Sequence, residues 1–266
     1  MTHALAHAKI NLALVVGPRM EDGNHEVVTV MAPLELADRI ELAPAGTLAV
    51  EGFSGDTLVR AALERLASAA GVEPRWRVTI EKRIPVAAGL GGGSSDAAAA
   101  LTLANATLPQ PLAADTLHAL AADVGADVPF FLTPGAKLGR GDGTVLDPLS
   151  LPRDFAAVLL LPHGATKPST AAVYEAFDAR TGEQGFERRV AGLEEALDPV
   201  DLRRLPPNDL ASSPHSQTLE QLGAVRADVT GAGPAVYGLF RDAAQAEDAM
   251  HALEGLGWVW VGNLGW

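Results

Sequence analysis

The chain has 266 residues, of which 48% are hydrophobic and 20% charged, which is typical of a globular protein with one large domain or two smaller ones. Its net charge is −13, from 33 acidic and 20 basic residues without a Lys- or Arg-rich stripe, so we expect no nucleic-acid partner. There is no apolar run of ~18–20 residues, no leader-like start and no cysteine, so we expect a cytoplasmic protein with no membrane association, disulfide or thiolate site.

The first half of the chain reads as short strands followed by helices. Strands are predicted from alternation of apolar and polar residues, and helices from an apolar period near 3.6. The strands expected in chain order are 9–16, 26–34, 39–42, 48–51 and 76–84, with a turn-rich connection over 17–24. The helices expected are 56–70, about 95–105 and 113–124.

The second half begins after a polar turn that Pro148 and Pro152 bracket, and we place a domain boundary there, between 1–150 and 151–266. The strands expected beyond it are 156–161, one that ends with 235–240, and 258–261. The helices expected are 169–179, 187–197, a short one after the turn at 206–209, and 243–256. Strands and helices mix without strict βαβ alternation, which favours the α+β class.

A glycine-serine run over 89–96 separates a predicted strand from an alanine-rich helix. Its glycines let the backbone approach an anion closely and adopt positive φ. Ser94, Ser95 and Asp96 are N-cap residue types, so we expect the helix to begin where the glycines end, with its free N–H groups directed at a bound anion. A Walker loop would need Lys in place of Gly93, and a dinucleotide fingerprint would need Gly in place of Ser94. A flexible linker fits this position poorly, so we predict a phosphate-binding loop in a nucleotide-using enzyme.

Two residues are candidates for the chemistry of phosphoryl transfer. Lys9 lies on one strand face together with Asn11, facing a polar cavity or solvent, and a solvated lysine is the alternative. Asp127 is a single carboxylate among apolar residues, and a turn before Pro129 is the alternative. A kinase needs a carboxylate to accept the hydroxyl proton and a cation to stabilise the transferring group, and this pair supplies both.

Two further features are candidate ligand-binding positions. His25 lies between two predicted strands, where its ring nitrogens could contact a base edge or simply face solvent. The glycines of 230–235 form either a tight turn or a ligand contact. The histidines are scattered and no HExxH occurs, so we expect no transition-metal site.

Taken together, these segments resemble the GHMP kinases. The matching segments, in family order, are 8–12, 22–26, 85–96, 125–130 and 231–233. They are similar in particular to the branch that acts on a cytidine-diphosphate-linked methylerythritol in the non-mevalonate isoprenoid pathway. The resemblance implies a two-domain α+β fold: an N-terminal ATP-binding domain with a left-handed βαβ phosphate loop, a C-terminal ferredoxin-like α/β domain, and an active site in the cleft between them.

The resemblance also implies roles for individual residues. Asp127 would be the base that deprotonates the substrate's 4-hydroxyl, and Lys9 would stabilise charge. ATP would be accompanied by Mg²⁺, which would be held through phosphate oxygens and water near Ser94 or Ser95. The residues that would bind ATP are Val86, Ala87, Ala88, Gly89, Leu90, Gly91, Gly92, Gly93, Ser94, Ser95 and Asp96. The small-molecule substrate would contact Asn11, Asn24, His25, Thr170, Tyr174, Gly231 and Gly233. His25 would recognise the cytosine, on which Tyr174 would stack, and the protein would be a monomer or weak homodimer.

The chain departs from the family pattern at four positions. Asn24 stands where a tyrosine commonly precedes the histidine, which removes half of an aromatic sandwich whose stacking is worth about 1–3 kcal/mol per base in nucleic-acid binders. Thr144 replaces a glutamate, and Ala232 and Pro234 replace small polar residues. Two alternatives stay open: a GHMP kinase for another small alcohol, such as homoserine or mevalonate, and a non-catalytic GHMP-fold ligand sensor.

Overall fold

The computed structural model describes residues 1–166, 169–180 and 182–265, which fold into two compact units. The first unit comprises Met1–Ala8, Leu36–Val86 and Gly91–Pro134, and the second comprises Lys9–Glu35, Ala87–Leu90 and Gly135–Trp266. The units are discontinuous in sequence because the long strands β1 (Thr2–Arg19) and β2 (His25–Pro44) contribute residues to both. The boundary that the sequence predicts near residue 150 differs from this division, because it separates two continuous segments. That boundary stays a prediction.

Both long strands extend well beyond the predicted ranges. The expected break between 26–34 and 39–42 is wrong, because β2 runs through Asp38. Asp38 is fully buried, and its carboxylate accepts hydrogen bonds from Lys82 Nζ and from the backbone N–H groups of Arg83 and Ile84. An aspartate whose sequence context predicts the end of a strand can lie inside a strand when its carboxylate has such hydrogen-bond partners.

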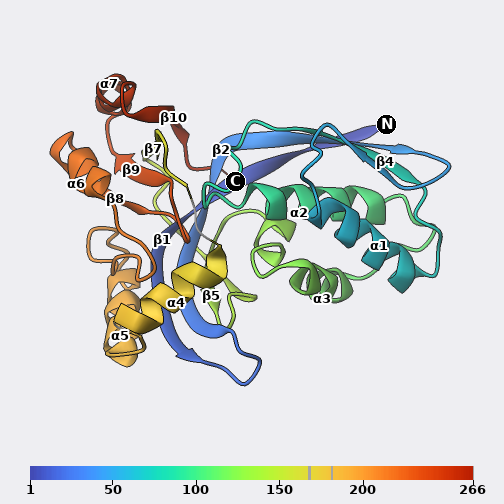
Figure 1. The fold of residues 1–266 in the computed structure, drawn as a ribbon, viewed down its shortest axis with the longest axis horizontal. Helices are drawn as coiled ribbons and strands as arrows, with labels where there is room; N and C mark the ends of the chain where they lie inside the picture. Colours follow the sequence, from blue (N-terminus) through green and yellow to red (C-terminus); the bar gives the residue numbers. More distant parts are fainter. Residues whose placement is uncertain (167–168, 181, 266) are drawn as a thin grey trace. The chain divides into compact units, whose positions relative to one another are not determined.

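The first unit packs three helices against a small sheet. Its strand β4 (Trp76–Glu81) pairs antiparallel with residues 39–44 of β2 and parallel with β3 (Ala49–Glu51). The helices are α1 (Leu58–Ala70), α2 (Gly92–Asn105) and α3 (Ala114–Val124), followed by the 3₁₀ turn η1 (Pro129–Leu132). Figure 1 shows α1, α2 and α3 side by side. The buried alanine side chains of α2 are small, so α1 can pack closely against this helix. This close packing holds the start of α2 in a defined position.

The second unit contains an antiparallel sheet of four strands in the order β10-β7-β9-β8. These are β7 (Ala156–Pro162), β8 (Arg226–Val229), β9 (Val236–Phe240) and β10 (Gly257–Asn263). Helices α6 (Pro214–Gln221) and α7 (Ala243–Leu253) contact this sheet, and Leu219 and Leu253 are fully buried in its core. Helices α4 (Thr170–Arg180) and α5 (Phe186–Leu197) complete the unit's helices among the described residues.

Two further strands of the second unit were not predicted. They are β5 (Ala136–Arg140), which pairs with residues 29–31 of β2, and β6 (Val145–Leu149), which pairs with β5. Pro148, interpreted as part of a turn, lies within β6. Because β6 is an edge strand, proline's missing N–H costs no sheet hydrogen bond on the open side.

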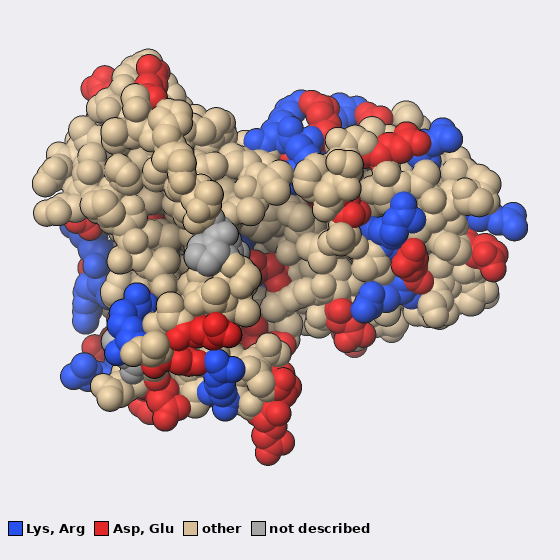
Figure 2. Space-filling model, viewed as in Figure 1, with Lys and Arg blue, Asp and Glu red and all other residues tan. Residues whose placement is uncertain are grey.

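The distribution of surface charge and the lengths of the helices relate to the predicted absence of nucleic-acid and membrane partners. On the face drawn in Figure 2, Lys and Arg side chains stand among Asp and Glu side chains rather than in one continuous basic stripe. Within the described ranges, every helix is too short or too polar to cross a bilayer. The absence of a nucleic-acid partner stays a prediction.

Candidate active site

The start of α2 differs from the prediction. The helix begins at Gly92 rather than after the glycines, because Gly91 adopts the left-handed conformation (φ 71°) and acts as the N-cap. Ser94 and Ser95 therefore lie inside the first turns and do not cap the helix, and no side chain caps its start in the described structure. The N–H groups of the first turn lack partners within the helix, so this helix start has the donors that an anion site needs, and anion binding there stays a prediction.

The preceding loop residues, Ala87–Leu90, belong to the second unit and are held there by the backbone. Lys9 donates its N–H to Leu90 O (2.9 Å), and Ala235 donates to Ala88 O (3.0 Å). Gly89 has φ 86°, and a Cβ there would lie 2.4 Å from Thr230 O, so only glycine fits. Ala87 is also left-handed (φ 56°), which is uncommon without glycine and typical of functional loops.

The second glycine motif forms the turn that packs on this loop. Gly231 (φ 57°) and Gly233 (φ 73°) both need positive φ, and Gly233 donates its N–H to Thr230 O (2.9 Å). A Cβ on Gly231 would lie 3.3 Å from Gly89 O and 3.5 Å from Asn11 Oδ1. The tight-turn interpretation is therefore right, and the turn lies beside the loop and Asn11; ligand contact stays a prediction.

Lys9 and Asn11 lie together in β1. Their side chains share one face of the strand, and Lys9 Nζ donates to Asn11 Oδ1 (2.8 Å). Both residues are buried, at 3% and 4% exposure, so the alternative of a solvated lysine is wrong. A buried ammonium with a fixed amide partner is suited to charge stabilisation.

Asp127 lies in the turn before η1. Val128 donates its N–H to Gly125 O (2.9 Å), so the turn that formed the alternative interpretation is present. The residue is half-buried and belongs to the first unit, whereas Lys9 belongs to the second. Their joint action in catalysis stays a prediction.

His25 is buried, and an oxygen atom lies near each of its ring nitrogens. Nδ1 lies 2.8 Å from Gly17 O, and Nε2 lies 3.3 Å from Asp178 Oδ1. Asp178 also accepts from Arg19 Nε (3.0 Å), and this hydrogen bond is the main cause that lowers the pKa of Asp178. Neither Asp178 nor Arg19 could be predicted as part of the site, because an ion pair across 159 positions leaves no local pattern.

The two predicted cytosine-binding residues lie together. The rings of His25 and Tyr174 stack with centroids 5.1 Å apart and an interplanar angle of 23°. A base cannot lie between two rings already in contact, so it would have to stack on an outer face. Asn24 is exposed and hydrogen-bonds to Asp22, and Thr170 is exposed at the first residue of α4.

A cluster of three charged residues, Asp38, Lys82 and Asp96, lies at the start of α2, and only Asp96 is among the predicted site residues. Lys82 Nζ donates to Asp96 Oδ2 (2.8 Å) and also to Asp38, and the two carboxylates are almost fully buried. Burial raises the pKa of Asp96 to about 7, helped by the Asp38 charge and opposed by Lys82. Burial lowers the pKa of Lys82, but the hydrogen bonds to Asp38 and Asp96 outweigh it and raise that pKa overall.

This raised pKa predicts a pH dependence of stability. Asp96 takes up its proton more readily in the folded chain than in the unfolded chain, whose pKa is 3.8, so stability falls as the pH rises from about 4 to about 7. In Asp96→Asn this contribution disappears, and the free energy of unfolding should fall less over the same window. Urea denaturation of both proteins at several pH values measures this. Parallel pH profiles would contradict the prediction.

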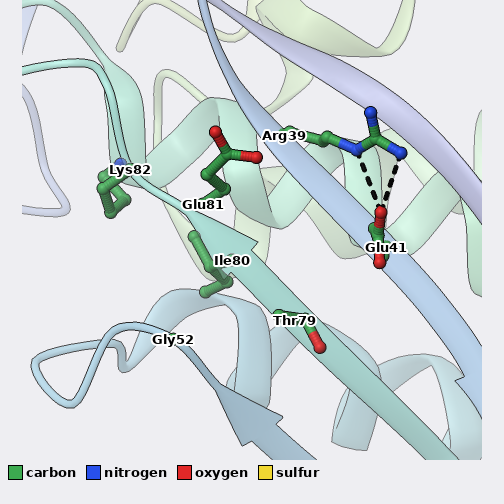
Figure 3. Close-up of a pocket in the computed structure, with 7 residues that line it drawn as sticks. All are labelled: Arg39, Glu41, Gly52, Thr79, Ile80, Glu81 and Lys82. Atoms are coloured by element: carbon green, nitrogen blue, oxygen red, sulfur yellow. Dashed lines mark hydrogen bonds and ion pairs between the residues drawn. The ribbon is translucent and has the colours of Figure 1, made fainter.

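A pocket of about 530 Å³ lies in the first unit, and Figure 3 shows its lining. The lining residues are Arg39, Glu41, Gly52, Thr79, Ile80, Glu81 and Lys82. Arg39 donates to Glu41 from Nε (3.0 Å) and Nη2 (2.8 Å), as the dashed lines show. None of the predicted site residues lines this pocket, but Lys82 links it to α2, because a Cβ on Gly92 would lie 3.2 Å from Lys82 Nζ.

Comparison with known proteins places this geometry in a family. The models "GHMP kinases N terminal domain" and "GHMP kinases C terminal" match residues 57–135 and 217–257. The 4-diphosphocytidyl-2-C-methyl-D-erythritol kinase of Pelotomaculum thermopropionicum is 39% identical over 261 residues, covering 90% of this chain and 89% of the relative. A crystal structure of 4-(cytidine 5'-diphospho)-2C-methyl-D-erythritol kinase matches with a TM-score of 0.82 and 36% identity, covering 100% of both chains. A mevalonate kinase structure has a TM-score of 0.74 at 13% identity, covering 100% of this chain and 99% of its own, which shows the fold alone.

The fold and its glycine loop are therefore those of a GHMP kinase, and the predicted α+β class with N- and C-terminal GHMP domains is confirmed. Sequence identity of 36–39% over nearly the whole chain also identifies the branch of the GHMP kinases to which the chain belongs. The chain belongs to the family of 4-diphosphocytidyl-2-C-methyl-D-erythritol kinases, as the resemblance predicted.

Proposed function

We propose that this enzyme transfers a phosphoryl group from ATP to a hydroxyl of 4-diphosphocytidyl-2-C-methyl-D-erythritol, in the non-mevalonate route to isoprenoid precursors. The match to kinases of that name along nearly the whole chain carries the proposal. The uncapped start of α2 beside a glycine loop supports it, because such a helix start binds phosphate. We also expect a cytoplasmic protein that is a monomer or weak homodimer.

The residues near α2 fit ATP accompanied by Mg²⁺. Among the described residues, no three His, Cys, Asp or Glu side chains gather as a metal site. This suits Mg²⁺, which commonly binds through substrate phosphates and water, with Ser94 or Ser95 nearby. The bound ion would offset phosphate charge, while the first-turn N–H groups of α2 orient the phosphates. Val86 to Asp96 would form this cradle.

Asp127 and Lys9 would supply the chemistry. Asp127 would accept the proton of the attacking hydroxyl, and the buried Lys9 ammonium would stabilise the charge on the transferring group. The expectation that the 4-hydroxyl is the acceptor needs correction, because position 4 carries the diphosphocytidyl group in the substrate's own name. The acceptor is then one of the remaining hydroxyls.

The second unit would recognise the substrate. Asn11 would position the methylerythritol part, and the stacked pair of His25 and Tyr174 would offer a face to the cytosine. Asn24 and Thr170 would complete this end of the site, and Gly231 and Gly233 would approach the substrate's phosphates. A kinase for homoserine or mevalonate would have no use for a base-stacking pair, and a sensor would have no need of Asp127 with Lys9.

A coupled assay of ATP consumption tests the proposal. We expect turnover with the cytidine-linked substrate, inhibition by added cytidine diphosphate, and no turnover with homoserine or mevalonate. Turnover of another alcohol would favour a different GHMP kinase. Binding of the cytidine substrate without phosphoryl transfer would favour the sensor.

A further inference from the structure

We propose that the Thr29 hydroxyl is a positioning group for the Lys9 ammonium and acts through the side-chain amide of Asn11. This rests on the proposed function, because it gives Lys9 a role in phosphoryl transfer. All three residues belong to the second unit, with Lys9 and Asn11 in β1 and Thr29 in β2. Each is at most 4% exposed, so water cannot readily replace the partners of these polar groups.

The hydrogen bonds form a chain with a fixed direction. Lys9 Nζ donates to Asn11 Oδ1 (2.8 Å), Asn11 Nδ2 donates to Thr29 Oγ1 (2.8 Å), and Thr29 Oγ1 donates to Ala13 O (2.8 Å). A hydroxyl has one proton, and the Ala13 carbonyl can only accept. Thr29 must therefore give its proton to Ala13 and can only accept from Asn11.

This direction decides which way the Asn11 amide faces. The end that meets Thr29 must be the NH₂ group, so the carbonyl oxygen is turned toward Lys9. A flipped amide would place its NH₂ against an ammonium, two donors face to face, and its oxygen against a hydroxyl whose proton is already committed. Thr29 thus fixes the orientation of the Asn11 carbonyl oxygen, which accepts a hydrogen bond from Lys9 Nζ.

The backbone of Asn11 is held from the opposite side. Asn11 N donates to Thr230 Oγ1 (3.1 Å), and that hydroxyl lies 3.3 Å from Gly89 O. Thr230 is fully buried in the glycine turn beside the loop. The same Thr230 hydroxyl lies 3.4 Å from Asn11 Oδ1, a longer contact than the 2.8 Å bond between Asn11 Nδ2 and Thr29 Oγ1. Because the main chain of Asn11 is anchored independently, loss of the Thr29 hydroxyl releases the NH₂ end of the amide without releasing the strand.

Thr29→Val tests the proposal, with Thr29→Ser as the rescue. Valine keeps the shape but removes the hydroxyl, and we expect kcat to fall about 10- to 100-fold while the KM values for ATP and the cytidine substrate change little. Serine keeps the hydroxyl and should restore kcat to within about threefold. A Thr29→Val enzyme with wild-type kcat, or a Thr29→Ser enzyme as slow as the valine variant, would overturn the proposal.

Thr107 offers a matched control in the first unit. Its hydroxyl likewise accepts one hydrogen bond, from Trp76 Nε1 (2.9 Å), and donates one, to Ala104 O (2.7 Å). Thr107→Val should leave kcat unchanged. An equal loss of kcat in Thr107→Val would mean that any lost threonine hydroxyl slows the enzyme, and would overturn the assignment to Thr29.

A second readout does not depend on the reaction. In ¹H–¹⁵N spectra the Asn11 side-chain NH₂, assigned by its loss in Asn11→Ala, should be protected from solvent exchange. Exchange should become about tenfold faster in Thr29→Val and stay slow in Thr29→Ser. Unchanged protection in the valine variant contradicts the role of Thr29, whereas a wild-type protein that shows this protection but no turnover contradicts only the proposed function.

Discussion

Asp127→Asn is expected to lower turnover by about 10²- to 10⁴-fold, because an amide cannot accept the proton of the attacking hydroxyl. The substitution keeps the size and shape of the side chain, so the KM values for both substrates should change little. The coupled ATP assay, run at saturating substrate, measures the loss. A variant within about tenfold of the wild type would contradict the role of Asp127 as the base.

The local structure makes this loss chemical rather than structural. Val128 is fully buried and anchors one side of the turn, and Phe130, 2% exposed, packs edge-on against Phe131 with ring centroids 4.9 Å apart. Neither anchor involves the Asp127 side chain, so the asparagine should occupy the same place. Asp123→Asn, an exposed aspartate in α3, is the matched control and should keep full activity.

Features with a local signal could be predicted from the sequence. The strand before the glycine run begins at Trp76 as predicted but ends at Glu81, and the alanine-rich helix ends at Asn105 as predicted. The buried strand β7 lies within one residue of its predicted range. Each depends on neighbours within a few positions, such as the apolar run of β7, which needs no knowledge of the rest of the fold. The ordered motifs that resemble GHMP kinases also identified the family, which the comparisons confirm.

Features that depend on distant partners could not be predicted. Asp38 lies 46 positions from Ile84, whose N–H it accepts, so its place inside a continuous β2 has no local pattern. The start of α2 was misplaced for a related reason: Ser95 and Asp96 are good caps in isolation, but Gly91 already ends the loop and Asp96 pairs with Lys82 instead. Capping preference is a weak guide where a charged partner competes.

The ion pairs of Lys82 with Asp38 and Asp96 predict a large effect on stability. Lys82→Met should lower the free energy of unfolding by about 3–5 kcal/mol at pH 8, because it leaves two buried carboxylates without their shared cation. The side chains of Asp38 and Asp96 are 0% and 2% exposed, so water cannot replace the ammonium. Chemical denaturation followed by circular dichroism measures the loss. At pH 5 the loss should be smaller, because Asp96, with a pKa already about 7, then carries a proton.

Arg83→Met is the matched control, because it removes a cation one residue further along the chain. Arg83 pairs with Glu81 at the surface, where both side chains are more than half exposed, so the change should cost at most about 1 kcal/mol. The double variant Lys82→Met/Asp96→Asn should recover part of the lost stability, because Asp38 then remains alone and keeps its bond from Ile84 N (2.8 Å). Equal losses in Lys82→Met and Arg83→Met, or no recovery in the double variant, would mean that burial of the paired carboxylates does not govern the stability of this unit.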